Sequence, residues 1–287
     1  MSVPPKRMVT IVPWVVLAIL VSLVIVFGCS EESGSSMGTS VASEVEIAAS
    51  EWEALQGITV LFGHQSVGQN IMKGVEEVAS DEAVVGFSLC EGAKAGSDPC
   101  LYHFRAGENG HPRTKIDALI NAVRESESGD LIYAGVKFCY VDLTDGRDAE
   151  QLFRAYQEFV ESLQERYPGV VLFHITTPLT TNPGGFKTRL KVLLGKRDLW
   201  EYADNIVRND YNELLRAEYS SRGRLFDLAR VESTWPDGSR ETFELDGAEY
   251  EALVPSYTDD GGHLNPQGRQ RVARYFLRFI ADLAIQQ

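Results

Sequence analysis

The stretch GITVLFGHQSVGQNIMKGVEEVA, residues 57–79, decides the fold because a strand pattern passes into a helix pattern across a short polar turn. Residues 57–63 are apolar on both faces, which is typical of a buried parallel strand. Beyond the turn, apolar residues recur at helical spacing and form one face: Val67, Ile71, Val75 and Val78. A strand that leads directly into an amphipathic helix is the repeating unit of α/β proteins.

The same alternation continues along the chain. We predict five strands, at residues 57–63, 83–90, 130–138, 169–175 and 224–228. Amphipathic segments separate them, and two helical faces are clear: Leu152, Tyr156, Phe159 and Leu163 in one, and Val272, Tyr275, Phe276, Phe279 and Leu283 in the other. Asn265 and Pro266 form a start signal for the last helix. The sequence therefore predicts an α/β sandwich with a parallel sheet.

The N-terminus carries an export or anchoring signal. Residues 8–28 form an uncharged apolar run that follows Lys6 and Arg7 and ends at Cys29. The run resembles a bacterial lipoprotein signal, in which Cys29 becomes the lipidated first residue of the mature chain. An uncleaved transmembrane helix is the alternative, since about 20 apolar residues span a bilayer. Either way the domain lies outside the cytoplasm, because positive residues stay inside.

This signal sets the predicted domain organisation. Residues 1–28 are the signal peptide or anchor, residues 29–45 are a Ser-, Gly- and Glu-rich flexible tether, and residues 46–287 are one catalytic-size domain. Removal of the signal takes away two positive charges and lowers the formal net charge from −14 to −16. This strongly negative net charge disfavours binding to nucleic acid or to an anionic membrane surface. We expect membrane contact through the N-terminal anchor only, and the sequence leaves the oligomeric state open.

The cysteines favour structural roles over catalysis. Cys90 and Cys100 flank a Gly-containing loop, and in an extracytoplasmic compartment a disulfide between them is plausible. Cys139 lies in a buried-strand pattern, so we expect an inert packed thiol there. No H-x-H or H-E-x-x-H motif is present, and we expect neither a metal nor a cofactor.

Ser66 has two interpretations, as the N-cap of the helix that follows it or as a nucleophile. Ligands bind beyond the carboxyl ends of the strands in parallel sheets, and Ser66 lies at such an end, as does the loop with Gly107 and Asn109. The two roles are compatible, because a helix N-terminus also offers free backbone N–H groups to an oxyanion.

A nucleophilic serine needs a histidine base and a group that orients it. His263 fits best, because Asp260 precedes it across two glycines in a turn that lets the carboxylate reach Nδ1; Asp259 fits less well. The other histidines have other expected roles: His174 in the core, His64 shaping the serine turn, and His103 and His111 beside the Gly107 loop.

Together, the serine in its Gly-containing turn, the Gly107 loop and the segment DGGHLNPQG (260–268) resemble the SGNH (GDSL-like) hydrolase superfamily. The resemblance covers residues 57–280, almost the whole domain. It implies a flavodoxin-like three-layer α/β/α fold with a five-stranded parallel sheet, and ester hydrolysis by a Ser-His-Asp triad. By position, Ser66 matches the nucleophile, His263 the base and Asp260 its partner. Gly107 matches the backbone donor to the oxyanion.

Two departures from the family pattern matter. GHQS, residues 63–66, replaces the family's Gly-Asp-Ser, and KFCYVD, residues 137–142, lacks the family's G-x-N-D segment with its oxyanion-binding asparagine. The amide of Asn109 is a candidate replacement, and a simple Asn-Gly turn is the alternative.

We therefore expect a surface-anchored serine esterase or O-acyltransferase, with acylated polysaccharide or a small ester as substrate. A non-catalytic carbohydrate-binding protein on the same fold is the alternative. Residues 176–198 and 233–253 are predicted to cover the active edge, either as a lid or as plain cover, with hairpin strands in the second segment.

Overall fold

The computed structural model describes residues 45–126, 132–182 and 200–286. The predicted signal or anchor (1–28), Cys29 and the predicted tether up to residue 44 lie outside the described residues. Within them, no helix is both long enough and apolar enough to cross a membrane. The described residues belong to one compact unit.

A five-stranded parallel sheet forms the centre of the fold and confirms the predicted α/β class. Its order is β2-β3-β1-β4-β5. The strands are β1 (Thr59–His64), β2 (Leu89–Glu91), β3 (Leu101–Arg105), β4 (Ile132–Val136) and β5 (Val170–Leu172). Just beyond β5, β6 (His174–Ile175) pairs in parallel with β7 (Leu225–Phe226). All carboxyl ends of the five strands therefore lie at one edge.

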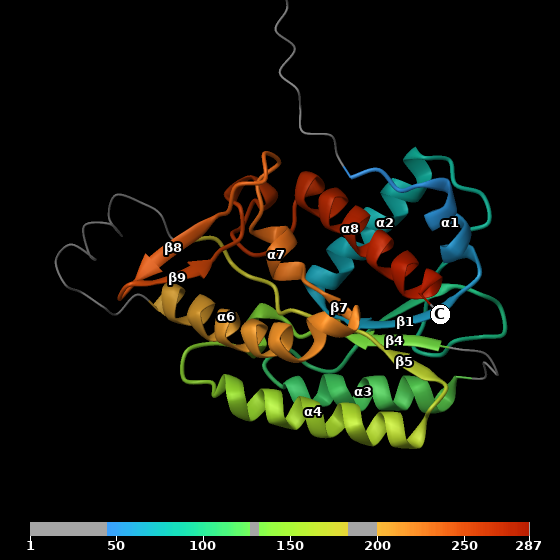
Figure 1. Cartoon of the computed structure of the whole chain (residues 1–287), viewed down its shortest axis with the longest axis horizontal. Coiled ribbons are helices and arrows are strands. Elements are labelled where there is room, and N and C mark those ends of the chain that lie inside the picture. The colour runs from blue at the N-terminus through green and yellow to red at the C-terminus, as the bar shows by residue number, and fades with distance from the viewer. Residues whose placement is uncertain (1–44, 127–131, 183–199, 287) are drawn as a thin grey trace, which may run out of the picture. The chain divides into compact units, whose positions relative to one another are not determined.

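Helices cover both faces of the sheet, which gives three layers (Figure 1). One face packs against α1 (Ala49–Gln56), α2 (Ser66–Asp81) and α8 (Pro266–Ile285). The other packs against α3 (Pro112–Glu125), α4 (Ala149–Arg166) and α6 (Trp200–Tyr219). Strand β1 serves both cores, since Val60 and Phe62 lie in the first and Leu61 in the second. Both faces of a central parallel strand are thus apolar, as its sequence indicates.

The predicted second strand is wrong in extent. Residues 83–88 form a loop, and only β2 at the sheet edge overlaps the predicted range 83–90. Strand β1 lies between β3 and β4, and β3 was not predicted. A disulfide joins Cys90 of β2 to Cys100, directly before β3, and Cys139 is a free, buried thiol. Both cysteine predictions are confirmed.

The predicted helical faces agree with the packing. On α4 the four predicted residues are all buried, and on α8 Val272, Phe276 and Leu283 are buried. Asn265 is the N-cap of α8 and accepts a hydrogen bond from the N–H of Gly268 at 3.0 Å. Shorter elements complete the chain: η1 (Tyr140–Asp142), η2 (Ser220–Arg222), α7 (Leu228–Glu232) and η3 (Pro255–Tyr257).

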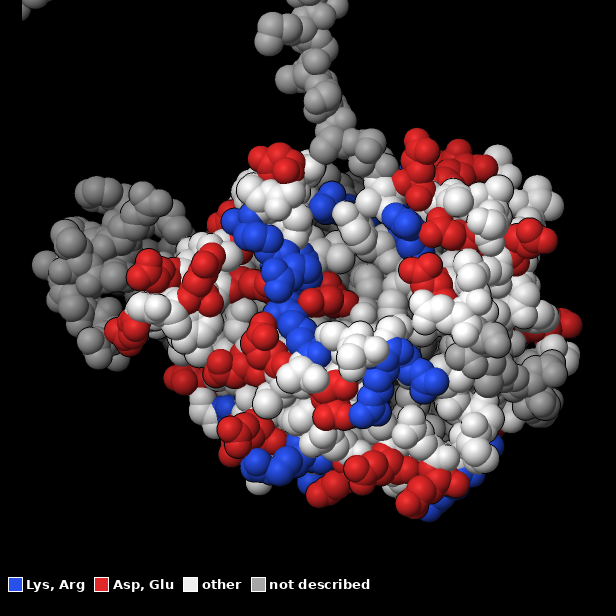
Figure 2. Space-filling model, viewed as in Figure 1, with Lys and Arg blue, Asp and Glu red and all other residues white. Residues whose placement is uncertain are grey.

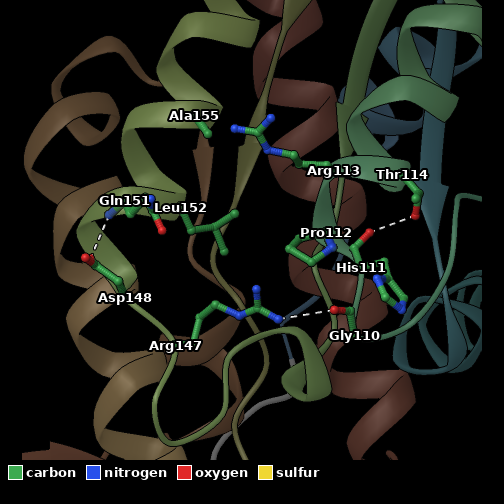
Figure 3. A pocket seen from close by; sticks show the side chains of 10 residues that line it. All are labelled: Gly110, His111, Pro112, Arg113, Thr114, Arg147, Asp148, Gln151, Leu152 and Ala155. Carbon is green, nitrogen blue, oxygen red and sulfur yellow. Dashed lines mark hydrogen bonds between the residues drawn. The ribbon is translucent and has the colours of Figure 1, made fainter.

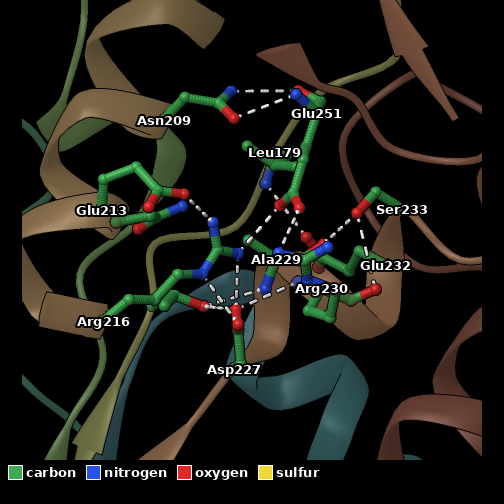
Figure 4. Close-up of polar contacts among 12 residues, drawn as sticks. Leu179, Asn209, Glu213, Arg216, Asp227, Ala229, Arg230, Glu232, Ser233 and Glu251 are labelled. Carbon is green, nitrogen blue, oxygen red and sulfur yellow. Dashed lines mark hydrogen bonds and ion pairs between the residues drawn. The ribbon is translucent and has the colours of Figure 1, made fainter. Parts of the chain in front are cut away.

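The predicted hairpin is present as β8 (Thr242–Leu245) and β9 (Ala248–Glu251), antiparallel across an Asp-Gly turn. A cluster of ion pairs ties it to the body (Figure 4). Arg216 of α6 binds Asp227 through two hydrogen bonds of 2.7 Å and Glu251 of β9 at 2.8 Å. The aromatic ring of Phe243 is buried against Tyr202 and Tyr250. These contacts join the hairpin to α6, and residues 183–198 of the other predicted cover lie outside the described residues.

Acidic side chains are spread over the face shown in Figure 2 and are not gathered in one patch. Several acidic side chains of the described residues pair with arginines, as Glu77 does with Arg269 and Glu51 with Arg278.

Candidate active site

Ser66 is the first residue of α2, and Gln65 is the N-cap. The N-cap interpretation of Ser66 is therefore wrong. Gln65 does not cap with its side chain, so the first backbone N–H groups of α2, including that of Ser66, have no partner within the helix. A half-buried hydroxyl thus lies beside unpaired N–H groups at the positive end of a 16-residue helix.

The side chain of Gln65 instead joins the serine turn to the loop after β3. Its Nε2 donates to the backbone oxygens of Ala106, at 2.9 Å, and Gly107, at 2.6 Å. The Ala106 N–H also donates to the backbone oxygen of His64 at 2.8 Å. The structure therefore brings Ser66 and Gly107 to the same place, at the carboxyl ends of neighbouring strands.

Gly107 has a backbone that only glycine accommodates here. Its φ is +56°, and a Cβ at this position would lie 2.5 Å from the backbone nitrogen of Lys115. The loop consequently packs directly on the first turn of α3.

Asn109 is oriented by a buried ion pair. Lys115 and Asp142 are both fully buried and paired. The Nζ of Lys115 also lies 3.0 Å from Oδ1 of Asn109. Because an ammonium only donates, this contact leaves the Nδ2 donors of Asn109 for another partner. Asp142 in turn accepts from the N–H of Gly110 at 2.7 Å, so an Asn-Gly turn and an oriented amide are both present.

His263 and Asp260 form a hydrogen-bonded pair in the loop before α8. The Nδ1 of His263 lies 2.6 Å from Oδ2 of Asp260, while Oδ1 accepts the N–H groups of Gly262, at 3.0 Å, and His263, at 2.8 Å. Burial raises the pKa of Asp260, but these hydrogen bonds lower it by more, so the pKa lies below its ordinary value. Asp259 instead accepts from Asn265 at 3.3 Å.

One hydrogen bond attaches this loop to the serine helix. The N–H of Leu264 donates to Oδ1 of Asn70 at 3.2 Å. Asn70 follows Ser66 by one helical turn and therefore lies on the same face of α2, about 6 Å along the axis. The structure thus places the His263 loop against the first turn of α2.

The Nε2 of His263 faces a tyrosine. It lies 3.3 Å from the hydroxyl of Tyr140, which begins η1 at the carboxyl end of β4. Within residues 45–126, 132–182 and 200–286, Ser66 makes no hydrogen bond to His263. All three predicted triad residues are at one sheet edge, but only His263 and Asp260 are joined.

The remaining histidines have other surroundings. His64 is buried, donates from Nδ1 to the Gln65 oxygen at 3.0 Å and accepts at Nε2 from His103 at 3.1 Å. Burial lowers its pKa to about 3, so the ring is neutral and supports the turn. His174 is buried against Tyr156 and Tyr219, as a core residue should be. His111 is exposed at the N-terminus of α3.

A cavity of about 430 Å³ adjoins the His263–Asp260 pair. Its lining includes Tyr140, Thr181, Arg208, Asp260 and Gly262. Its volume falls within the range of ligand pockets, about 300–1,000 Å³.

A second cavity, of about 400 Å³, lies beside Gly110, between α3 and α4 (Figure 3). Its lining includes His111, Arg113 and Arg147, and Arg147 donates to the Gly110 oxygen at 3.2 Å. In the described part of the chain, no group of three or more His, Cys, Asp or Glu side chains is arranged to hold a metal ion.

Sequence reasoning missed the residues that hold the site together. Gln65 and Asn70 are within four residues of Ser66, and Asn70 is a polar residue next to the core position Ile71, which was a usable signal. Tyr140 and the buried pair of Lys115 and Asp142 gave no such signal, because their partners are distant in sequence.

Comparison with known proteins gives structural likenesses alone, since no family model and no curated protein matches the chain. A structure from Streptococcus pneumonia, provisionally described as a platelet activating factor, is 11% identical, with 80% of this chain and 89% of that chain covered and a TM-score of 0.46. The periplasmic domain of the lipopolysaccharide acetyltransferase of Salmonella ser. Paratyphi A is 13% identical, with coverage of 81% and 88% and a TM-score of 0.41. The OSK domain of Drosophila Oskar is 15% identical, with coverage of 88% and 100% and a TM-score of 0.37.

Proposed function

We propose that the protein is a serine esterase of SGNH type that hydrolyses or transfers an acyl group, with Ser66 as nucleophile, His263 as base and Asp260 as its partner. The observation that carries the proposal is the 2.6 Å contact between His263 and Asp260, in a loop bonded to α2 one turn from Ser66. A carboxylate on Nδ1 fixes the tautomer in which Nε2 can accept a proton.

In the proposed first step, the Ser66 oxygen bonds to the ester carbonyl carbon while its proton passes to Nε2 of His263. The backbone N–H groups of Ser66 and Gly107, with the Asn109 amide, hold the negative oxygen, and each such donor contributes about 3 kcal/mol. The C–O bond to the alcohol then breaks, and His263 returns the proton to the alcohol. Water releases the acyl-enzyme, or a sugar hydroxyl takes the acyl group instead.

The proposed location is extracytoplasmic, with the domain anchored through Cys29 or an N-terminal helix. The disulfide between Cys90 and Cys100 supports it, because such bonds persist in oxidising compartments. O-acetylated carbohydrate is the substrate class that best fits that location and the hydrogen-bonding residues of the 430 Å³ cavity.

The test is covalent labelling of the full-length protein in detergent with a fluorophosphonate probe, together with turnover of p-nitrophenyl acetate. We expect both to vanish in Ser66→Ala and to persist in Ser80→Ala, which removes an exposed serine at the other end of α2. Activity that survives in both Ser66→Ala and His263→Ala would reject the proposal.

A carbohydrate-binding protein without turnover is the second candidate, and the contact of Tyr140 with Nε2 favours it because that nitrogen is occupied. A folded wild-type protein that neither reacts with the probe nor turns over esters, but binds glycans, would establish this alternative.

A further inference from the structure

Tyr140 holds the one nitrogen of His263 that the proposed mechanism needs. The Asp260 carboxylate is ionised and can only accept, so Nδ1 of His263 donates to it, and in this tautomer Nε2 presents a lone pair. The Tyr140 hydroxyl, at 3.3 Å, therefore donates to Nε2. The two rings also meet edge to face, with centroids 5.7 Å apart.

The tyrosine is held in this position from two sides. Arg208, which is 2% exposed, donates from Nε to the backbone oxygens of Tyr140, at 2.9 Å, and Leu143, at 3.1 Å. Its guanidinium carbon lies 5.7 Å from the centroid of the Tyr140 ring. On the other side, a Cβ on Gly262 would come within 3.2 Å of the ring, so glycine leaves the room that the ring fills. The backbone of η1 is thus fixed, and Tyr140 is among the residues that line the 430 Å³ cavity.

Of the groups that contact His263, Tyr140 is the one whose hydrogen bond must break before Nε2 can accept a proton. Asp260 contacts Nδ1, and its other oxygen is bound by backbone N–H groups. Arg208 is engaged with carbonyl oxygens, Thr180, Asn205 and Asp204. Nε2 cannot accept the Ser66 proton while it accepts from Tyr140, because a ring nitrogen has one lone pair in the ring plane.

We propose that Tyr140 is a positioning residue for His263. In the free protein its hydroxyl donates a hydrogen bond to Nε2 of His263. When the ester enters the cavity, the hydroxyl donates instead to an oxygen of the alcohol part of the ester. This inference rests on the proposed function. Only hydrogen bonds are exchanged, so the reaction steps are those given above. The exchange favours esters of polyhydroxy alcohols, which offer an acceptor oxygen beside the acyl group, over esters that lack one.

Tyr140→Phe tests the inference because it removes the hydroxyl and keeps the ring against Gly262. Tyr102→Phe is the matched control, since Tyr102 donates an exposed hydrogen bond to the Asp98 oxygen at 3.2 Å. The first readout is the ¹⁵N resonance of Nε2 in full-length protein labelled at its five histidines, assigned with His263→Gln. The resonance is expected to move in Tyr140→Phe and to stay in Tyr102→Phe.

The second readout is the ratio of kcat/KM for a mono-O-acetylated methyl glycoside to that for p-nitrophenyl acetate. Loss of one hydrogen bond is expected to lower this ratio about two- to tenfold in Tyr140→Phe and not in Tyr102→Phe. A purely structural role would lower both rates alike and leave the ratio unchanged.

The outcomes separate this inference from the proposed function. An unmoved Nε2 resonance overturns the contact with His263, and an unchanged ratio overturns the transfer to substrate. A wild-type protein without labelling or turnover overturns the proposed function and the transfer together, while a moved resonance would still establish the contact.

Discussion

Asn70 accepts a hydrogen bond from the backbone N–H of Leu264 at 3.2 Å, across 194 positions of the chain. This bond joins the helix that begins at Ser66 to the loop that carries His263 and Asp260. The side-chain amide of Asn70 thus helps to hold the proposed nucleophile, Ser66, and the proposed base, His263, in fixed positions relative to each other.

Asn70→Ala is therefore expected to reduce activity without removing any proposed catalytic group. The change leaves the N–H of Leu264, a residue 3% exposed, without its acceptor, at a cost of about 1–3 kcal/mol in the free energy of unfolding. The His263 loop would shift, and a displacement of about 1 Å lowers rates up to about 100-fold. Fluorophosphonate labelling rates measure the loss. Gln69→Ala, on the exposed side of the same helix, should label like wild type; equal losses in both variants would refute the role of Asn70.

Asp260 and its neighbour Asp259 provide a matched pair of substitutions. Asp260→Asn should lower kcat about 10³- to 10⁴-fold, because an amide no longer fixes the Nδ1–H tautomer of His263. Asp259→Asn should retain activity, since Asp259 contacts Asn265 and not the ring. Steady-state hydrolysis of p-nitrophenyl acetate by both variants gives the comparison, and a larger loss in Asp259→Asn would contradict the assignment.

Alanine substitutions at Gly107 and Gly110 distinguish the effect of backbone strain from that of steric crowding by the added Cβ. Both have positive φ, +56° and +81°, but only Gly107 would bring a Cβ within 2.5 Å of backbone atoms. Both alanine variants should lose about 1–3 kcal/mol of stability from strain, and Gly107→Ala should lose more and also lose activity. Urea unfolding and labelling of the two variants measure this difference. A fully active Gly107→Ala would show that the loop does not serve the oxyanion.

Glu232 should make stability depend on pH. Burial raises its pKa to about 8, against an ordinary value of 4.5. Between these values the folded state binds more protons at this group than the unfolded state, so its contribution to stability falls as pH rises from about 4.5 to 8, by up to about 1.4 kcal/mol per pH unit. Lys137, whose pKa is lowered by burial, acts in the opposite direction.

Glu232→Gln removes the titration of Glu232 and keeps that of Lys137. Urea unfolding between pH 5 and pH 9 measures the free energy of unfolding of both proteins. Over this range we expect it to rise more steeply with pH, or to fall less steeply, in Glu232→Gln than in wild type. Glu249→Gln, at an exposed position of β9, is the control and should follow wild type. Parallel pH profiles of Glu232→Gln and wild type would show that the carboxyl does not titrate in this range.

The strand predicted at residues 83–90 shows that a short apolar run does not always form a buried strand. Val85 is apolar but 87% exposed, in the loop before β2. The neighbouring strand β3 contains His103 and ends at Arg105, which shortens its apolar run. His103 is nevertheless buried because His64 of β1 accepts its hydrogen bond. A partner on another strand can satisfy a polar group that would otherwise disfavour burial.

The sequence by itself determined the α/β class, the parallel sheet, the helical faces and the pairing of Asp260 with His263, because each depends on local periodicity or on residues close in the chain. Only the tertiary structure decided that β3 lies beside β1, that Asn70 holds the His263 loop and that Tyr140 occupies Nε2 of His263. These contacts join residues far apart in sequence, and such contacts exist only after the sheet has assembled and its carboxyl edge has brought the loops together.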